Sequence, residues 1–439
     1  MNNMMLTDLV NGLTVTMMEI LQPENLIMTL KHIHPVCLSI CLLLLITSGV
    51  DSHAGEQRAY ALTNAHLFNG VDNKIVSNRT VLVRNGLIER ITDSTATVAG
   101  DYTIVDCEGN YLMPGLFDVH THLETLEQAR RALESGVTTI RTAGVPGYQD
   151  VALAALSKTG KLAGPDVVAA GVYVTPNLEA TILADPRLVD LVAGVQSDEA
   201  LRQLVRVNID RGATVIKTRG TERAGRADTD PREQVYTRHQ LEVVVDEAGK
   251  AGIPVMVHAH GDEGGRAAVL AGARSIEHGS YLTADTLELM KKRGTFLVPT
   301  YITMAEMLEE ELEGVLRVRG MYMVPKLEKV IQQAHRLGVR MATGADNYYD
   351  TQSVNRISLE VWHLARLGLS PFEALQAATV NAAELLLLAD RSGRIEAGYE
   401  ADMILLPSNP LEDIAALQDV LLVMSNGQIA LKRIPFGKD

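Results

Sequence analysis

Cysteine is scarce in this sequence of 439 residues, and long runs of like charge are absent from it. The only cysteines are Cys37, Cys41 and Cys107, from which neither a disulfide framework nor a CxxC metal knuckle can be built. The formal net charge is −14, whereas a nucleic-acid surface needs basic patches. The sequence therefore indicates neither a disulfide-stabilised scaffold nor a nucleic-acid-binding protein.

Several motifs that would identify other enzyme classes are also absent. No expected strand is followed by GxGxxG or GxxxxGK[ST], the loops that bind dinucleotides and nucleoside triphosphates. Neither the GxSxG nucleophile elbow nor the HExxH zinc motif occurs, and no internal repeat is visible. These absences argue against the usual nucleotide-dependent, serine-hydrolase and zincin enzymes.

An apolar run lies near the N-terminus. Lys31 precedes the run 36–50, and the segment after the run ends in Ala54. The run has 15 residues, which suits a signal-peptide core and is shorter than the ~20 residues that span a bilayer. We predict a leader over residues 1–54, with a signal peptide from Met28 to Ala54, and a secreted or periplasmic mature protein. An uncleaved membrane anchor is the alternative.

Two segments far apart in the sequence share the pattern of a β-hairpin. Asn85-Gly86 and Asn426-Gly427 each stand between alternating apolar stretches, and both residues of such a turn adopt positive φ. Chain ends of a domain tend to lie close together. We therefore predict that residues 55–112 and 393–439 form one small β-sandwich domain.

Strand and helix patterns alternate between residues 113 and 392. Hydrophobic residues make up 46% of the sequence, so a large packed core is expected. Alternating strands and helices predict a parallel sheet, and eight such units predict an α/β fold closed into a (β/α)8 TIM-like barrel. An open doubly wound sheet is the alternative. The expected strands are Leu112–His122, Thr138–Gly144, Asp166–Val174, Ala213–Gly220, Pro254–Gly261, Ser275–Gly279, Thr295–Thr300 and Arg340–Asn347.

Imidazole and carboxylate groups gather at the ends of these strands, where barrel enzymes carry their active residues. His120 and His122 are two residues apart in a strand, so their side chains face the same side. His258, His278 and Asp346 lie at the ends of later strands. These groups suit zinc or a similar first-row metal.

Lys217 lies within an apolar strand, where an unpaired ammonium group is costly. Burial lowers the pKa of a lysine and exposes a neutral amine. Such an amine can react with carbon dioxide to give a carbamate, which is a carboxylate able to bridge two metals. The alternative is a lysine that extends to solvent. Four histidines, one lysine and one aspartate on strands one, four, five, six and eight indicate a shared metal site.

In these motifs the sequence resembles the amidohydrolase superfamily. It is most similar to the branch of imidazolonepropionase-like proteins and zinc dipeptidases that act on Xaa-Pro or Xaa-Arg/Lys dipeptides. The resemblance covers the chain from about Ala59 to its end. The motifs that carry it are Met113–His122, Gly136–Arg141, Val257–Gly261, Ser275–Gly279 and Gly393–Asp402.

The resemblance implies two divalent metals, expected to be Zn²⁺, about 3.5–4 Å apart and sharing a hydroxide nucleophile. It also implies that Asp346 takes the hydroxide proton and passes it to the leaving nitrogen, as a general base that becomes a general acid. The implied ligands are His120, His122 and Asp346 for one metal and His258 and His278 for the other, with carboxylated Lys217 as the bridge.

Three further residues are candidates for contact with substrate. Arg219 should share the side of Lys217 and could bind a substrate carboxylate. His260 could donate to the scissile carbonyl as a catalytic residue, and a Tyr in the position of Tyr236 contacts substrate in the dipeptidase branch. A surface or packing role is the alternative for each. Many relatives have Asp where Thr142 follows Arg141, which leaves the substrate class open.

The sequence thus predicts a binuclear metal-dependent hydrolase that cleaves a C–N amide bond in a small peptide or N-acyl amino acid. Hydrolysis of a cyclic amide, a lactone or an aromatic amide is a second possibility, because the same hydroxide attacks any of these. A non-catalytic binding protein is a third, against which the full ligand set argues. No nucleic-acid partner and no membrane span after cleavage are expected. A homo-oligomer is suggested by analogy with the fold alone.

Overall fold

The computed structural model describes residues 59–309, 314–351 and 356–434. The predicted leader, residues 1–54, lies outside the described residues. Among those that are described, no helix is both long and apolar enough to cross a membrane. The predicted domain boundaries at residues 112 and 393 stay a prediction.

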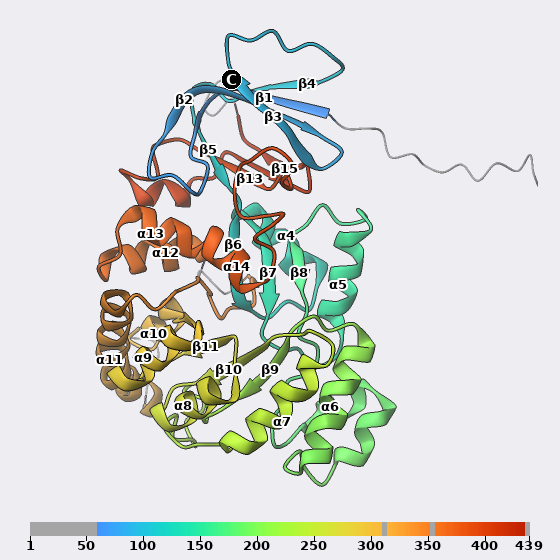
Figure 1. Cartoon of the computed structure of the whole chain (residues 1–439), viewed down its shortest axis with the longest axis vertical. Coiled ribbons are helices and arrows are strands. Elements are labelled where there is room, and N and C mark those ends of the chain that lie inside the picture. Colours follow the sequence, from blue (N-terminus) through green and yellow to red (C-terminus); the bar gives the residue numbers. More distant parts are fainter. Residues whose placement is uncertain (1–58, 310–313, 352–355, 435–439) are drawn as a thin grey trace, which may run out of the picture. The chain divides into compact units, whose positions relative to one another are not determined.

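Strands from both ends of the described chain form one continuous sheet (Figure 1). β5 pairs antiparallel with β13, so that Met113 stands opposite Ile404. Both Asn-Gly pairs have the positive φ angles that their turns require, 53° and 82° for the first pair and 50° and 68° for the second. The strands are β1 (Ala59–Leu67), β2 (Val76–Arg84), β3 (Leu87–Asp93), β4 (Thr103–Asp106), β5 (Tyr111–Pro114), β13 (Met403–Leu406), β14 (Leu422–Ser425) and β15 (Gln428–Lys432).

This sheet has an apolar core of its own, which is separate from the larger core of the chain. The order of the strands is β15-β14-β13-β5-β1-β2-β3, with β4 paired to β1. Leu62, Val81 and Leu405 are fully buried within that core, although they come from opposite ends of the chain. Burial of this shared apolar surface favours folding of the two segments as one unit.

The remaining strands are parallel and follow one another around a ring. β6 pairs with β7 and β7 with β8, while β9, β10, β11 and β12 form a second run of parallel neighbours. Their ranges are β6 (Leu116–Thr121), β7 (Val137–Thr142), β8 (Asp166–Val168), β9 (Ile216–Arg219), β10 (Val255–Ala259), β11 (Ser275–His278) and β12 (Phe296–Val298).

Backbone contacts join these runs and close the barrel. The Val174 amide donates to the Lys217 carbonyl at 2.9 Å, which connects the end of the third strand to β9. A parallel bridge between Leu297 and Met341 adds the eighth strand to β12. The eighth strand returns to β6 through the Asp346 amide, which donates to the His120 carbonyl at 2.6 Å. The predicted TIM-like barrel is therefore confirmed, and the open-sheet alternative is wrong.

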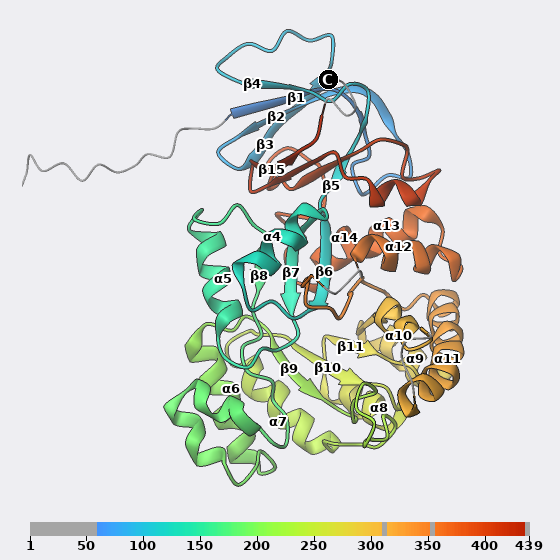
Figure 2. The same cartoon turned by 180° about the vertical axis from the view of Figure 1, so that it is seen from behind.

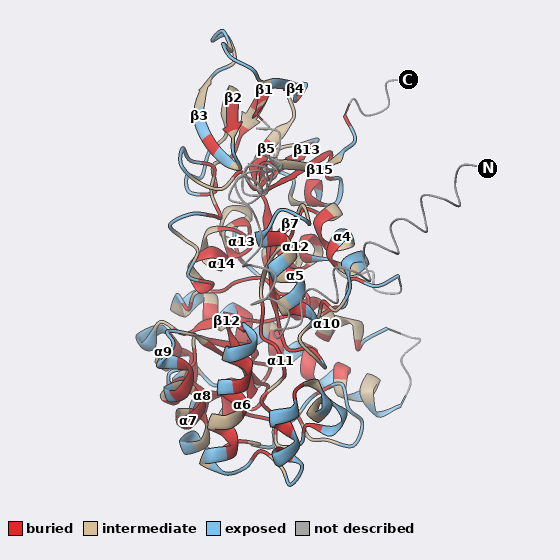
Figure 3. Ribbon diagram, turned by 90° about the vertical axis from the view of Figure 1, so that its right-hand side faces the viewer, coloured by how far each residue is buried: buried red, intermediate tan, exposed pale blue. Residues whose placement is uncertain are grey.

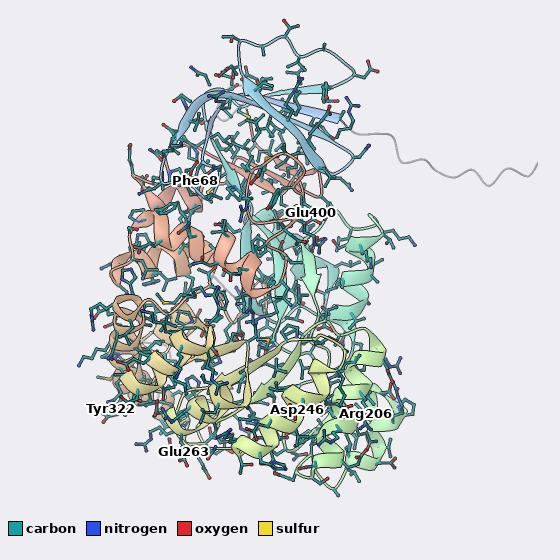
Figure 4. The ribbon with its side chains drawn as sticks, viewed as in Figure 1. Phe68, Arg206, Asp246, Glu263, Tyr322 and Glu400 are labelled. Carbon is teal, nitrogen blue, oxygen red and sulfur yellow. The ribbon has the colours of Figure 1, made fainter. Side chains whose placement is uncertain are left out.

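Helices follow the barrel strands and bury one face against them (Figure 3). α4 packs on β7 and α5 on β8 (Figure 2). Arg206, Asp246 and Glu263 mark the exposed faces of α6, α7 and α8 (Figure 4). The helices are α4 (Leu126–Glu134), α5 (Gln149–Lys158), α6 (Asp198–Arg211), α7 (Arg238–Gly249), α8 (Asp262–Ala271), α9 (Ala284–Arg293), α10 (Tyr301–Glu306), α11 (Val315–Leu337), α12 (Ile357–Arg366), α13 (Pro371–Ala377) and α14 (Val380–Leu385).

The local sequence determines where several of these helices begin. α7 starts at a capping box, in which the Thr237 side chain accepts from the Gln240 amide and the Gln240 side chain accepts from the Thr237 amide. Its buried residues Leu241, Val244 and Ala248 recur at helical spacing. α7 is thereby fixed against the barrel, and the loops at the carboxyl ends of barrel strands carry polar residues.

Candidate metal centre

All six predicted metal ligands lie at the carboxyl ends of barrel strands, and their side chains meet. The Asp346 carboxylate lies 3.2 Å from Nε2 of His122 and 3.4 Å from Nε2 of His120. The Lys217 Nζ lies 3.4 Å from the same His120 nitrogen. The His278 ring centroid is 5.0 Å from that of His120 and 4.5 Å from that of His258. Residues more than 200 positions apart thus surround one space.

Two groups of donor atoms within this space have the spacing of a metal site. One consists of His120, His278 and Asp346, and the other of His258, His260 and His278; in each, the donor atoms lie within 4.8 Å of one another. His260, which was predicted to contact substrate, therefore also lies where it could bind a metal. The roles of the individual residues as ligands stay a prediction.

Burial favours the uncharged forms of the histidines and of the lysine. It lowers the pKa of His258 and His278 well below the usual value and that of His260 to about 3, so these imidazoles are neutral, as metal ligands must be. Lys217 is 2% exposed, and burial lowers its pKa to about 8 although Glu277 and Asp346 counteract the shift. A neutral amine is accordingly accessible near physiological pH.

Asp346 remains ionised despite its enclosure. Burial alone would raise the pKa of this carboxyl, but attraction to His120 and hydrogen bonds with His120 and His122 lower it below its usual value. The result is an anionic oxygen near the neutral imidazole of His278, which is a suitable environment for a divalent cation.

Each imidazole is oriented through a ring nitrogen by a polar neighbour. Nδ1 of His122 donates to the Gly144 carbonyl at 2.8 Å, and Nε2 of His258 lies 3.1 Å from the Glu222 carbonyl. Nδ1 of His278 lies 2.7 Å from the Thr300 hydroxyl, and Nδ1 of His260 lies 3.0 Å from the Ser280 hydroxyl. A polar neighbour that holds one ring nitrogen is common among metal-binding histidines.

Glu277 is a functional residue that the sequence reasoning missed. Its carboxylate lies 2.6 Å from Nδ1 of His120 and 2.9 Å from the Arg141 guanidinium. Burial raises the pKa of Glu277, but Arg141 and His120 outweigh it and lower the value to about 2. Glu277 is 0% exposed and Arg141 is 2% exposed, so this is a buried ion pair that also orients His120.

Thr142, which follows Arg141 at the end of β7, contacts a buried carboxylate. The Thr142 hydroxyl donates to the Asp150 carboxylate at 2.6 Å, and Asp150 also accepts from the amides of Ala170 and Gly171. A buried carboxylate eight residues further along the chain thus lies beside Thr142, at the second and third strands.

The two remaining candidates for substrate contact, Arg219 and Tyr236, are both engaged by other residues of the protein. Arg219 is 9% exposed, and its guanidinium donates to the carboxylate of Glu222 at 2.9 Å and to the Thr175 hydroxyl. Tyr236 is fully buried in the main core, and its hydroxyl donates to the Val195 carbonyl at 2.7 Å. This bond favours a packing role for Tyr236 over the predicted contact with substrate.

We expect Glu277→Gln to lower the free energy of unfolding by about 3–5 kcal/mol, because Arg141 would keep a buried charge without a counter-ion. Urea unfolding followed by circular dichroism measures the change. Glu134→Gln is the matched control, since its partly exposed ion pair with Arg130 is worth less than about 1 kcal/mol. A change as small as the control's in the Glu277 variant would contradict the role given to this carboxylate.

Comparison with known proteins agrees with this geometry. Residues 111–430 match the model of the amidohydrolase family. Ochratoxinase from Aspergillus niger is 31% identical over 351 residues, which are 70% of this chain and 72% of that protein. Imidazolonepropionase from Mesorhizobium japonicum is 27% identical over 75% of this chain and 86% of that protein.

A solved structure of a Xaa-Pro dipeptidase with bound methionine superposes with a TM-score of 0.75 at 25% identity, covering 84% of this chain and 99% of that one. The predicted resemblance to the superfamily and to this branch is confirmed. The chain therefore belongs to the amidohydrolase family, as a metal-dependent hydrolase of amide-type bonds built on a TIM barrel with an additional β domain.

Proposed function

We propose that this enzyme is a binuclear metal-dependent amidohydrolase that cleaves the C–N bond of a small peptide or an N-acyl amino acid. The observation that carries the proposal is the convergence of Lys217 with His120, His278 and Asp346 in one buried space. The similarity to proteins named Xaa-Pro dipeptidase and ochratoxinase supports an amide substrate of small size.

The residues present fit a pair of divalent cations. The imidazoles of His258 and His278 are neutral, the Asp346 carboxylate is anionic, and polar neighbours hold ring nitrogens of these histidines. His120, His122 and Asp346 would hold one metal, and His258 and His278 the other. Zn²⁺ suits this set of nitrogen and oxygen donors.

Lys217 would complete the site as a carbamate. Its neutral amine nitrogen forms a bond to the carbon of carbon dioxide and loses a proton, which converts a neutral group into a carbamate anion. This change suits its place beside His120 and near Asp346, because a bridging anion lowers the repulsion between two cations.

Bound divalent metals supply Lewis-acid polarisation of the scissile carbonyl and activation of water. Asp346 accepts the proton of the attacking water and passes it to the leaving nitrogen, acting as general base and then as general acid. His260, whose ring stacks on that of His278 at 4.7 Å, orients the carbonyl oxygen, while Ser280 fixes the direction of the imidazole.

We expect Asp346→Asn to lower kcat by about 10²–10⁴-fold, because the amide cannot accept the proton. The assay panel contains Xaa-Pro and other dipeptides, N-acyl amino acids, ochratoxin, a cyclic amide and a lactone, and metal content is measured in parallel. Asp285→Asn on the exposed start of α9 is the control and should keep full turnover. Full activity in the Asp346 variant would refute its role as proton carrier.

The same panel tests the reaction class with the unaltered enzyme. Cleavage of the linear amides supports the proposal, and preference for the cyclic amide or the lactone supports the alternative. A protein that holds two metals per chain and hydrolyses no compound of the panel would contradict the proposed function.

The carbamate makes metal binding depend on carbon dioxide. We expect metal reconstitution of the apoprotein in buffer depleted of carbon dioxide to bind less metal than in bicarbonate buffer. Lys217→Arg keeps the positive charge but cannot form this carbamate, so its metal content should be low in both buffers. Lys250→Arg, which alters an exposed lysine paired with Glu247, is the control. Equal loading in every case would contradict a carbamate bridge.

We also propose that the protein is exported and acts as a secreted or periplasmic enzyme. The support is the apolar run 36–50 and its short length. N-terminal sequencing of the protein from its native host should give a mature chain that starts after Ala54. An intact leader in the membrane fraction would favour the anchored alternative.

A further inference from the structure

Tyr173 is a polar residue at the barrel end that the proposed metal site does not use. It lies between β8 and Val174, the residue that bridges to Thr218 of β9. Its hydroxyl oxygen is buried and finds no hydrogen-bond partner among the residues that the structure describes. An unsatisfied buried hydroxyl costs about 1–3 kcal/mol, so a ligand that satisfied it would recover this energy.

The Tyr173 side chain lies beside the proposed metal site. Lys217 Nζ is 5.7 Å from the Tyr173 ring centroid and 3.4 Å from Nε2 of His120. A tyrosine hydroxyl can donate a hydrogen bond. Among the described residues, Tyr173 therefore supplies a buried donor that has no acceptor and lies close to the proposed metal ligands.

Three cations surround the Tyr173 ring at similar distances. Lys217 Nζ, the Arg219 guanidinium and the Arg223 guanidinium lie 5.7, 5.8 and 5.6 Å from the ring centroid. Lys217 belongs to the metal site, and Arg219 is engaged by Glu222 and a threonine hydroxyl. Of these three cations, only Arg223 is without a role in the metal site and without an ion-pair partner among the described residues.

Arg223 is exposed, and within the described ranges it forms no ion pair. Its guanidinium lies 5.6 Å from the centroid of the Tyr173 ring, which Lys217 of the proposed metal site also contacts. Arg223 therefore combines an exposed guanidinium with a position beside Tyr173. A buried hydroxyl donor and an exposed guanidinium at one tyrosine ring form a pair suited to a carboxylate.

We propose that the Tyr173 hydroxyl and the Arg223 guanidinium together bind a free carboxylate of the substrate and make the enzyme selective for amides that carry one. This inference rests on the proposed amidohydrolase function and deepens it. It assigns the recognition of the carboxylate to Arg223 instead of Arg219, which was the candidate from sequence. Arg219 acts through Glu222 to hold the loop that carries Arg223.

The test compares the best-cleaved dipeptide of the panel with the same dipeptide whose terminal carboxylate has been converted to a carboxamide. For the acid, Tyr173→Phe and Arg223→Gln should each lower kcat/KM by about 10–100-fold, mainly through KM, because each removes a hydrogen bond to a charged group. For the carboxamide, both variants should stay within about threefold of the unaltered enzyme. Tyr173→Phe keeps the ring, so the contacts with the cations are preserved.

Arg226→Gln is the matched control, because this exposed arginine lies three residues further along the same loop and pairs with Asp228. It should leave the ratio of acid to carboxamide activity unchanged. An unaltered ratio in both Tyr173→Phe and Arg223→Gln would overturn the inference, as would an unaltered enzyme that cleaves acid and carboxamide equally well.

Calorimetric binding separates this inference from the proposed function. If the metal-loaded protein hydrolyses no compound of the panel, the proposed function fails, but binding of N-acetyl-proline and of N-acetyl-prolinamide still tests the carboxylate site. Tighter binding of the acid that is lost in Arg223→Gln and kept in Arg226→Gln supports it. Equal affinity for the two compounds overturns it.

Discussion

A buried carboxylate, that of Glu277, holds together the elements from which the site is built. It comes from β11 and contacts His120 of β6 and Arg141 of β7, so three strands of the barrel share one charged network. Such a network is stable only when every member is satisfied, because an unpaired charge in the interior is costly. With Nδ1 of His120 held by Glu277, its Nε2 faces Lys217 and Asp346. The geometry of the proposed metal site follows from that orientation.

The site also contains backbone strain. His278, Thr300 and Asp346 have φ angles of 71°, 47° and 49°, in the left-handed region that is unfavourable for residues other than glycine. Conformations of this kind cost of order 1–3 kcal/mol each and persist only where the surroundings impose them. Here His278 contacts the Thr300 hydroxyl, and the Asp346 amide donates to the His120 carbonyl. The bonds that close the barrel and orient the ligands therefore also maintain the strain.

The sequence predicted the positions of the six site residues because strand periodicity and strand order determine them. His120 and His122 face one side of a strand, and a closed parallel barrel brings the end of the eighth strand back to the first. The argument that singled out Lys217, an ionisable group in an apolar strand, applies equally to Glu277 and would have found it. The contact between Thr142 and Asp150 could not be predicted, because it depends on how the loop after the second strand folds back. The same holds for Tyr236, whose hydroxyl partner lies 41 residues away.

The loop after β9 connects the proposed metal chemistry with substrate recognition. Glu222 contacts both sides, because its carbonyl lies 3.1 Å from Nε2 of His258 and its carboxylate binds Arg219. Arg319 of α11 donates to the carbonyls of Ala224, Arg226 and Thr229, and so fixes the far side of the loop. Because one guanidinium binds three carbonyls of this loop, the backbone around Arg223 is restricted. The backbone next to Arg223 is therefore held, and the Arg223 guanidinium lies 5.6 Å from the Tyr173 ring centroid. A defined position of this kind is what the proposed recognition of a carboxylate at a fixed distance from the scissile bond requires.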